Sequence, residues 1–357
     1  MSVTQGSPGS AAVGERMLRV NPLRRLLVRP ETGAVAGSIA VWIFFAVVAG
    51  NSGFLTIRGT SSYLSVAAEL AIQAVPVALL MIGGEFDLSV GSTVGACGMI
   101  IALLSAQYGW SIWASIVVAL IFAVLVGMMN GYLVMRTRLP SFIVTLGTSY
   151  ILLGVTTGVT TLVANGLTVV SGIDQAPGYG VAKALFATKI NFGVQDFSGF
   201  PIEILWALAL VALATWLLLG TSFGNWIFGV GGDANAARNV GVPVKPLKIG
   251  LFMTTSFVAA LTGVMIALRL ASTQAGQGVG DEFQYIIAAV VGGCVLTGGF
   301  GSAIGASLGA LIIGMAFIGI QFSGWNTDWR FLFLGVILLV AVLVNNYIRK
   351  RAEGARR

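Results

Sequence analysis

Long apolar segments fill most of this sequence and are broken only briefly by charged residues. Charged side chains make up 9% of the 357 residues, and 57% of the residues are hydrophobic. Soluble domains carry roughly 25% charged residues, whereas a helix that crosses a bilayer needs roughly 20 consecutive apolar residues. The sequence therefore predicts an all-α, polytopic integral membrane protein.

Hydropathy along the chain predicts about ten transmembrane helices. The segments around residues 88–107 and 283–309 are rich in glycine, so we expect them to contain broken or re-entrant helices. The predicted spans cover residues 33–50, 62–82, 88–107, 111–134, 141–164, 203–220, 247–270, 283–298, 303–321 and 329–348.

Basic residues are distributed unevenly between the connecting segments. Because Lys and Arg are enriched in cytoplasmic loops, we expect both termini in the cytoplasm, the loop 165–202 outside and the loop 221–246 inside. This orientation places 15 of the 20 basic residues on the cytoplasmic side. These are Arg16, Arg19, Arg24, Arg25, Arg29, Arg136, Arg138, Arg238, Lys245, Lys248, Arg349, Lys350, Arg351, Arg356 and Arg357.

The predicted organisation is a basic cytoplasmic tail at 1–30, a transmembrane domain at 31–348 and a second basic cytoplasmic tail at 349–357. The net charge of +7 suits contact with anionic lipid at the inner membrane surface. We therefore expect no nucleic-acid partner.

Several kinds of chemistry lack the residues that they need. The chain contains no histidine, and no GxxxxGK[ST], GxSxG or HExxH motif occurs in it. We expect no metal site, no cofactor and no catalytic residues. If this protein moves a solute with ATP, another chain must bind the ATP.

The segments "VGSTVGA" at 90–96 and "FGSAIGA" at 300–306 resemble each other, and a Gly-Gly pair precedes each. Transporters often consist of duplicated halves with broken helices at matching positions. Alternatively, the Gly-xxx-Gly spacing only lets helices approach closely, and it recurs at 127/131 and 154/158. Both interpretations remain open.

Two carboxylates, Glu85 and Asp87, lie directly after the first Gly-Gly pair. Asp87 or Ser89 could cap the helix that follows, or the break could line a solute path, because acids at membrane depth usually face protein or water. We expect Glu85 to be solvated. Glu69, with Gln73 one turn later, could line a pore or lie at the outer interface.

The segment "GGDANAARNVG" at 231–241 has the signals of a short helix. Asp233 occupies a capping position, an Ala-rich turn with Arg238 follows, and Gly241 can stop the helix. A short helix exposed to the cytoplasm could bind another protein. The alternative is an ordinary connecting loop.

Four segments in the same order resemble the ribose-type sugar permeases of ABC importers. They are "GGEFDLSVGS" at 83–92, "NGYLVMRTRLPSFIVTLGT" at 130–148, "GNWIFGVGGDANAARNVGV" at 224–242 and "GDEFQYIIAAVVGGCVLTGGFGSAIGA" at 280–306. Two details depart from that pattern, because Glu85-Phe86 stands where one hydrophobic residue is expected and Gln284 stands where a second acid is expected.

The resemblance implies an all-α permease of about ten spans that works as a dimer in a bacterial inner membrane. It also implies a cytoplasmic ATP-binding subunit and an extracytoplasmic sugar-binding protein as partners. The implied cargo is a monosaccharide or polyol, and a nucleoside or a sugar-like autoinducer remains possible within the family. An ion-coupled secondary carrier is the alternative from another class.

Two groups of candidate site residues follow. The residues expected to couple to the ATPase are Gly232, Asp233, Ala236, Ala237, Arg238 and Gly241. Those expected at the translocation pathway or gate are Glu69, Gln73, Gly84, Phe86, Asp87, Ser89, Asn130, Phe142, Thr145, Glu282 and Gly293.

Overall fold

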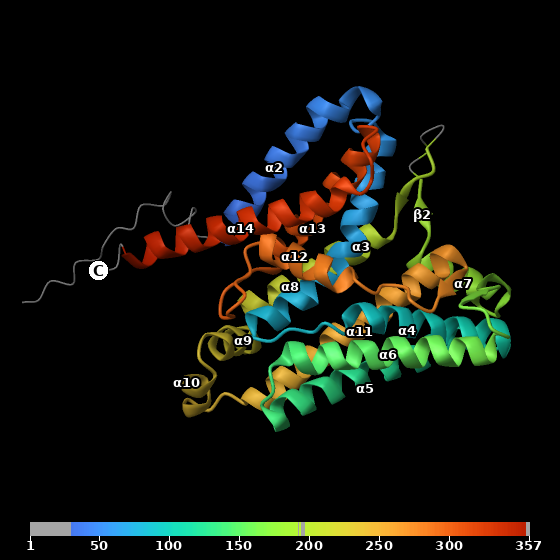
Figure 1. Cartoon of the computed structure of the whole chain (residues 1–357), viewed down its shortest axis with the longest axis horizontal. Helices are drawn as coiled ribbons and strands as arrows, with labels where there is room; N and C mark the ends of the chain where they lie inside the picture. Colours follow the sequence, from blue (N-terminus) through green and yellow to red (C-terminus); the bar gives the residue numbers. More distant parts are fainter. Residues whose placement is uncertain (1–29, 192, 194–196, 355–357) are drawn as a thin grey trace, which may run out of the picture.

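The described part of the chain in the computed structural model comprises residues 30–191, 193 and 197–354, and it forms 13 α-helices and two small sheets (Figure 1). The predicted tail 1–30, with its five arginines, lies almost wholly outside the described residues, as do Arg356 and Arg357. The predicted all-α membrane architecture is confirmed.

Eight helices in the described residues are long and apolar enough to cross a bilayer. They are α2 (Pro30–Ala49), α3 (Ile57–Ile82), α4 (Val90–Ala102, extended by a π-helical turn at Leu103–Gln107), α5 (Ile112–Thr137), α6 (Ser141–Val163), α8 (Glu203–Gly220), α11 (Val244–Leu270) and α13 (Ala303–Phe322). A further helix, α14 (Trp329–Gly354), has a shorter apolar stretch at Trp329–Val344. Its last residues, 349–354, belong to the segment predicted as the basic C-terminal tail.

The glycine-rich segment at 283–298, which we expect to be broken or re-entrant, is not one continuous helix. Helix α12 (Asp281–Val291) has 11 residues, and at 1.5 Å per residue it is about half as long as the hydrocarbon core is thick. A non-helical segment at 292–302 leads from α12 to α13. This is the broken helix that the glycine content indicated.

The segment predicted as a long external loop is folded. It contains helix α7 (Tyr179–Phe186) and strands β1 (Val169–Ser171), β2 (Lys189–Ile190) and β3 (Phe200–Pro201). Strand β1 pairs with β4 (Ser272–Gln274), and β2 pairs with β3, both antiparallel. A short 3-10 turn at Ile173–Gln175 belongs to the same region, and another at Gly50–Ser52 follows α2.

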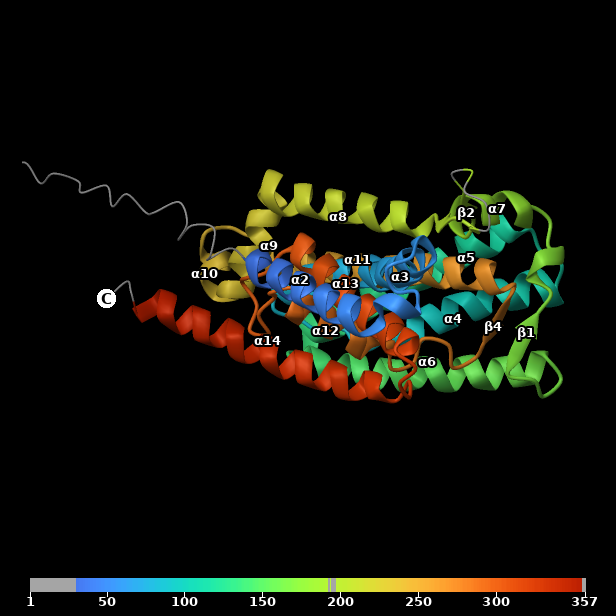
Figure 2. The ribbon, with the colours of Figure 1, turned by 90° about the horizontal axis from the view of Figure 1, so that it is seen from above.

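The two ends of the helix bundle carry different elements. Helix α7 and strand β1 lie at one end, and the short helices α9 (Ser222–Gly232) and α10 (Ala234–Asn239) lie at the other (Figure 2). In the same view the start of α2 and the end of α14 point toward the α9–α10 end. Helices α5, α6, α8 and α11 run between the two ends.

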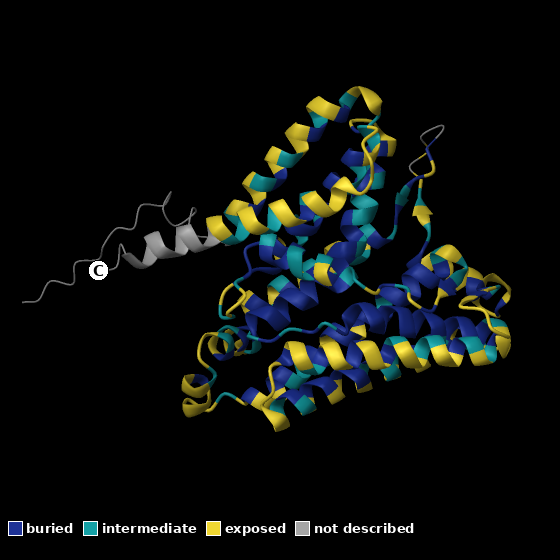
Figure 3. Cartoon of the chain, viewed as in Figure 1, coloured by how far each residue is buried: buried dark blue, intermediate teal, exposed yellow. Residues whose placement is uncertain are grey.

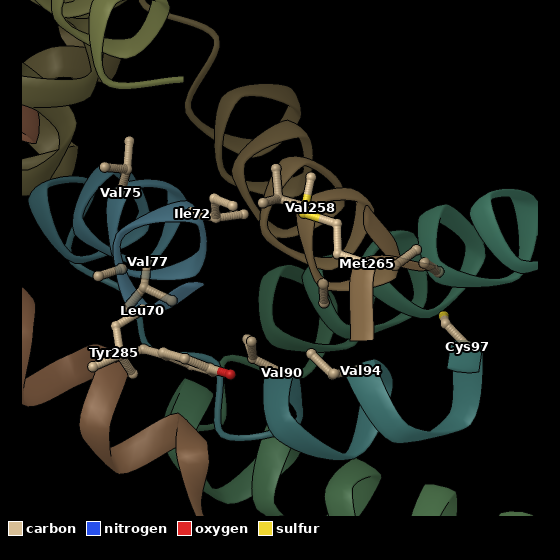
Figure 4. Close-up of a cluster of buried hydrophobic side chains, with 14 of the residues drawn as sticks. Leu70, Ile72, Val75, Val77, Val90, Val94, Cys97, Val258, Met265 and Tyr285 are labelled. Atoms are coloured by element: carbon tan, nitrogen blue, oxygen red, sulfur yellow. The ribbon is translucent and has the colours of Figure 1, made fainter. Parts of the chain in front are cut away.

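Helices α3 and α11 form the centre of the core (Figure 3). Val90, Val94 and Cys97 of α4 lie in one apolar cluster with Val258 and Met265 of α11 (Figure 4). By contrast, α2, α6 and α8 are mostly exposed and expose apolar side chains. Apolar exposure along whole helices is expected where lipid or another membrane chain covers them.

Glycines allow the closest helix approaches in this core. A Cβ atom on Gly305 of α13 would lie 1.9 Å from the carbonyl oxygen of Gly292, at the end of α12. One on Gly91 of α4 would lie 2.2 Å from the oxygen of Gly278. The Gly-xxx-Gly spacing therefore serves close approach at both of the sequence segments that resemble each other.

We predict that Gly305→Ala destabilises the protein by about 1–3 kcal/mol, because the added methyl group overpacks the contact with Gly292. Thermal unfolding in detergent measures the change. The control is Gly335→Ala on α14, where no atom of the described part of the chain lies within 4 Å of the added Cβ. Equal unfolding temperatures for the two variants would contradict this packing.

Candidate functional site

Helices α3 and α12 end with the same backbone geometry. After α3, the N–H of Gly84 bonds a carbonyl three residues back at 2.9 Å, and that of Glu85 bonds one five residues back at 3.1 Å. After α12, Gly293 and Cys294 make the same two bonds at 2.9 and 3.0 Å. Gly84 and Gly293 have φ of +80° and +95°, which favours glycine at both positions.

The helices that follow these breaks begin differently. Ser302 caps α13 by accepting a hydrogen bond from the N–H of Gly305 at 3.2 Å. Its sequence counterpart Ser92 lies inside α4 and bonds the hydroxyl of Ser149 at 2.8 Å. The two similar sequence segments therefore follow the same type of helix ending, at the ends of α3 and α12. The helices α4 and α13 that come next begin differently.

Asp87 does not cap α4, so this part of our interpretation of the sequence is wrong. Its Oδ1 atom accepts the N–H of Ser89 at 2.8 Å and the Ser89 hydroxyl at 2.6 Å. Ser89 is itself the first residue before α4 and makes no capping bond. Asp87 is 1% exposed, and its Oδ2 atom has no hydrogen-bond partner among the residues that the structure describes. The carboxylate therefore fixes the turn that precedes α4.

Asn130 of α5 joins this turn to α6. Its amide nitrogen donates to the hydroxyl of Ser89 at 2.9 Å, and its oxygen accepts from Thr148 of α6 at 2.7 Å. Both residues are buried. The predicted residues Asp87, Ser89 and Asn130 are thus part of one hydrogen-bonded network.

Two hydroxyl groups of α6 accept hydrogen bonds from the backbone of the break between α3 and α4, which we call the first break. The N–H of Phe86 donates to Ser141 Oγ at 3.0 Å, and the N–H of Leu88 donates to Thr145 Oγ1 at 2.9 Å. Ser141 and Thr145 are four residues apart, so they lie on one face of α6. Phe142 is 51% exposed and lies away from this face.

A second buried carboxylate lies beside the start of α4. The Oε2 atom of Glu282 accepts the N–H of Gly280 at 2.9 Å. A Cβ atom on Gly91 would lie 2.3 Å from that oxygen, so Glu282 lies against the first turn of α4. The structure thus brings Asp87 and Glu282 to the same helix, although they are far apart in the sequence.

The other candidate pathway residues lie along α3. Glu69 forms an ion pair with Arg269 at 2.7 Å, and Arg269 also approaches Glu203 at 3.6 Å. Gln73 is fully buried and donates to the carbonyl oxygen of Thr255 at 3.2 Å, so it joins α3 to α11. No motif in the sequence singled out Arg269 and Glu203, although charged residues within or beside apolar spans are a recognised functional signal.

Glu85 is not solvated as we expected. It is 9% exposed, and its Oε1 atom lies 2.5 Å from Nζ of Lys248 near the start of α11. Sequence analysis counted Lys248 only as a basic residue of the cytoplasmic side. Removing either partner of a buried ion pair leaves an uncompensated charge.

The short helix predicted at 231–241 is confirmed as α10. Asp233 caps it, accepting the N–H groups of Asn235 at 2.8 Å and Ala236 at 3.0 Å. The bonds from Ala236 and Asn235 hold the pKa of the Asp233 carboxyl below its ordinary value. The stabilisation that this cap provides is therefore complete at pH values above the ordinary pKa of an aspartate carboxyl. It is lost only as the pH falls through the lowered pKa of Asp233. Gly241 follows the helix with φ of +87°.

The residues of this segment that we expect to couple to the ATPase differ in exposure. Ala237 is 6% exposed and packs into its own chain, so it does not offer its side chain to a partner. Gly232, Ala236 and Arg238 are exposed, and Arg238 Nη1 donates to Asn235 Oδ1 at 3.2 Å. Within the described residues, no cluster of three or more Asp, Glu or Cys side chains is suited to a metal ion.

We predict that Asp87→Leu destabilises the protein by about 1–3 kcal/mol, because it leaves the buried N–H and hydroxyl of Ser89 without their acceptor. Asp87→Asn keeps an acceptor oxygen and places its amide where Oδ2 has no partner, so it should unfold close to the wild-type temperature in detergent. If Asn destabilises as much as Leu, the charge itself is required.

Comparison with known proteins gives the family of this chain. The ribose import permease protein of Escherichia coli K12 is 32% identical over 86% of this chain and 92% of its own length. The xylose transport system permease protein of the same organism is 29% identical over 89% of this chain and 92% of its own. No solved structure matches. Residues 59–342 match the family described as the permease component of the branched-chain amino acid transport system, and the chain belongs to this family of transport permeases.

Proposed function

We propose that this protein is the membrane-spanning subunit of an ATP-binding-cassette importer for a monosaccharide or polyol. A separate cytoplasmic subunit supplies the energy of ATP, and an extracytoplasmic binding protein delivers the sugar. The observation that carries the proposal is the match to a ribose and a xylose permease over almost the whole length of all three chains.

The cargo follows from the relatives rather than from the family description. That description names branched-chain amino acids, whereas these two relatives are named for pentoses. We infer a sugar for this chain. A nucleoside or a sugar-like autoinducer is chemically close to a pentose, and both belong in any screen of cargoes.

We further propose that the α9–α10 end of the bundle faces the cytoplasm of a bacterial cell and that the α7 end faces outward. Arg136 lies in the last turn of α5, Arg138 directly follows that helix, and Arg238 lies in the last turn of α10. Their position supports the positive-inside orientation. Anionic lipid of the inner leaflet would contact this side.

A second copy of the chain is the partner that we propose within the membrane. Helix α6 carries Gly147, Gly154 and Gly158, and a Cβ added at any of them would meet no described atom within 4 Å. Small residues exposed on a membrane helix allow another helix to approach closely. Light scattering of the purified protein in detergent distinguishes one copy from two.

Cysteine labelling tests the orientation. We predict that a membrane-impermeant thiol reagent added outside cells modifies a cysteine at Lys183 and does not modify one at Asn235. Both side chains are exposed, while Cys97 and Cys294 are buried and give little background. The opposite labelling pattern would overturn the orientation.

Segment α10 is the surface that we propose for the ATP-binding subunit, because it is exposed, capped and compact. We predict that Arg238→Glu lowers sugar uptake and sugar-stimulated ATPase activity together by about tenfold, which corresponds to the loss of about 1.4 kcal/mol of binding free energy. Arg238→Lys keeps the charge and should retain most of the activity. The measurement uses proteoliposomes that contain the permease, its ATPase and its binding protein.

The same preparation tests the proposed function. Uptake of a pentose or polyol that requires both ATP and the binding protein supports an importer. Uptake that follows an ion gradient in the absence of ATP would favour a secondary carrier instead. ATP-dependent uptake of a branched-chain amino acid but no sugar would overturn the proposed cargo.

A further inference from the structure

Five glycines from three separate segments meet at the α9–α10 end of the bundle. Gly84 belongs to the break after α3, Gly231 and Gly232 end α9, and Gly298 and Gly299 lie in the segment between α12 and α13. We call these five residues the glycine junction. The two helix breaks, which are about two hundred residues apart in the sequence, thus converge on one short helix.

The contacts within the glycine junction are between backbones. A Cβ atom on Gly231 would lie 1.7 Å from the carbonyl oxygen of Ile82, and one on Gly298 would lie 2.8 Å from Cα of Gly84. The N–H of Gly299 donates to the same oxygen of Ile82 at 2.8 Å. Because no side chain lies between these backbones, a shift of one segment acts directly on the others.

The Glu85–Lys248 ion pair links the glycine junction to α11. Glu85 follows Gly84 directly, and Lys248 lies nine residues after the end of α10, in the first turns of α11. A Cβ atom on Gly84 would lie 4.0 Å from Nζ of Lys248. The ion pair therefore ties the first break to the helix that leaves the α9–α10 segment.

We propose that the glycine junction and the Glu85–Lys248 pair transmit the movement of α9–α10 to both helix breaks, so that they set how much sugar is moved for each ATP hydrolysed. The proposal rests on the proposed function, in which the ATPase acts on α9–α10. Glu85, Lys248 and Gly231 are positioning residues in this scheme. They act on the turn that holds Asp87 and on the segment that leads to α13.

The arrangement gives the extra acid of this sequence a role. Glu85 stands where the resembling permeases are expected to have a single hydrophobic residue, and a buried carboxylate there would be costly without a partner. Lys248 supplies that partner from a different helix. The energy of an ion pair depends more strongly on the positions of its two groups than the energy of an apolar contact does. The pair therefore fixes the position of the first break relative to α11.

The test compares the ratio of sugar moved to ATP hydrolysed, measured in proteoliposomes that contain the whole complex. In Gly231→Ala the added methyl group must separate α9 from the end of α3. We expect this ratio to fall by about tenfold, within the usual range of coupling between sites, while ATPase activity persists. The control is Gly250→Ala on α11, where the described residues place no atom within 4 Å of the added Cβ. Its ratio should equal that of the wild type.

The ion pair gives a second set of variants in case Gly231→Ala does not fold. Glu85→Gln combined with Lys248→Gln removes both charges and should lower the ratio with little loss of thermal stability. Glu85→Lys combined with Lys248→Glu restores a pair in the reversed sense and should recover part of the ratio. If the ion pair had only a structural role, these variants would change the unfolding temperature and leave the ratio of sugar moved to ATP hydrolysed unaltered.

The outcomes separate the two proposals. If the wild-type complex transports sugar and all these variants keep the wild-type ratio, the role of the glycine junction is wrong and the importer assignment stands. If the wild-type complex shows no sugar-stimulated ATPase activity, the proposed function fails, and the inference that rests on it fails too.

Discussion

Unpaired backbone groups at a helix break constrain this structure more than any other feature. In the low-dielectric interior of a membrane protein, each N–H and C=O needs a partner within the protein. After α3, the hydroxyls of Ser141 and Thr145 accept the N–H groups of the break, and Asp87 accepts the next donor, from Ser89. Without these acceptors the break would be too costly, and α3 and α4 could not change direction there.

Glycine determines how closely the elements around the breaks can pack. The contacts between Gly305 and Gly292, and between Gly231 and the end of α3, leave no room for a side chain. Close backbone packing and satisfied hydrogen bonds together produce a core in which neighbouring segments move as units. This property connects the fold to the proposed transport cycle, because a rigid contact passes on a displacement that a soft contact would absorb.

The site was predictable where its signal was local in the sequence. Asp233, its helix and Gly241 could be identified because capping and stopping depend on residues a few positions apart. Asp87 could be identified as a candidate because a carboxylate between apolar segments is costly at membrane depth unless it faces protein or water. Ser89 was named as an alternative cap, whereas the structure shows it donating to Asp87. The pairing of Glu85 with Lys248 was missed, because the two residues are 163 positions apart.

The sequence by itself determined that this chain is a helical membrane protein with glycine-broken helices, because hydrophobic length and glycine position depend only on neighbouring residues. It also indicated the family, through four motifs in the same order. The tertiary structure alone decided that both breaks meet at the end of α9, that Glu85 is buried against Lys248 and that Ala237 faces its own chain. These features depend on how distant helices pack, and packing follows from the fit of many side chains at once rather than from any local pattern.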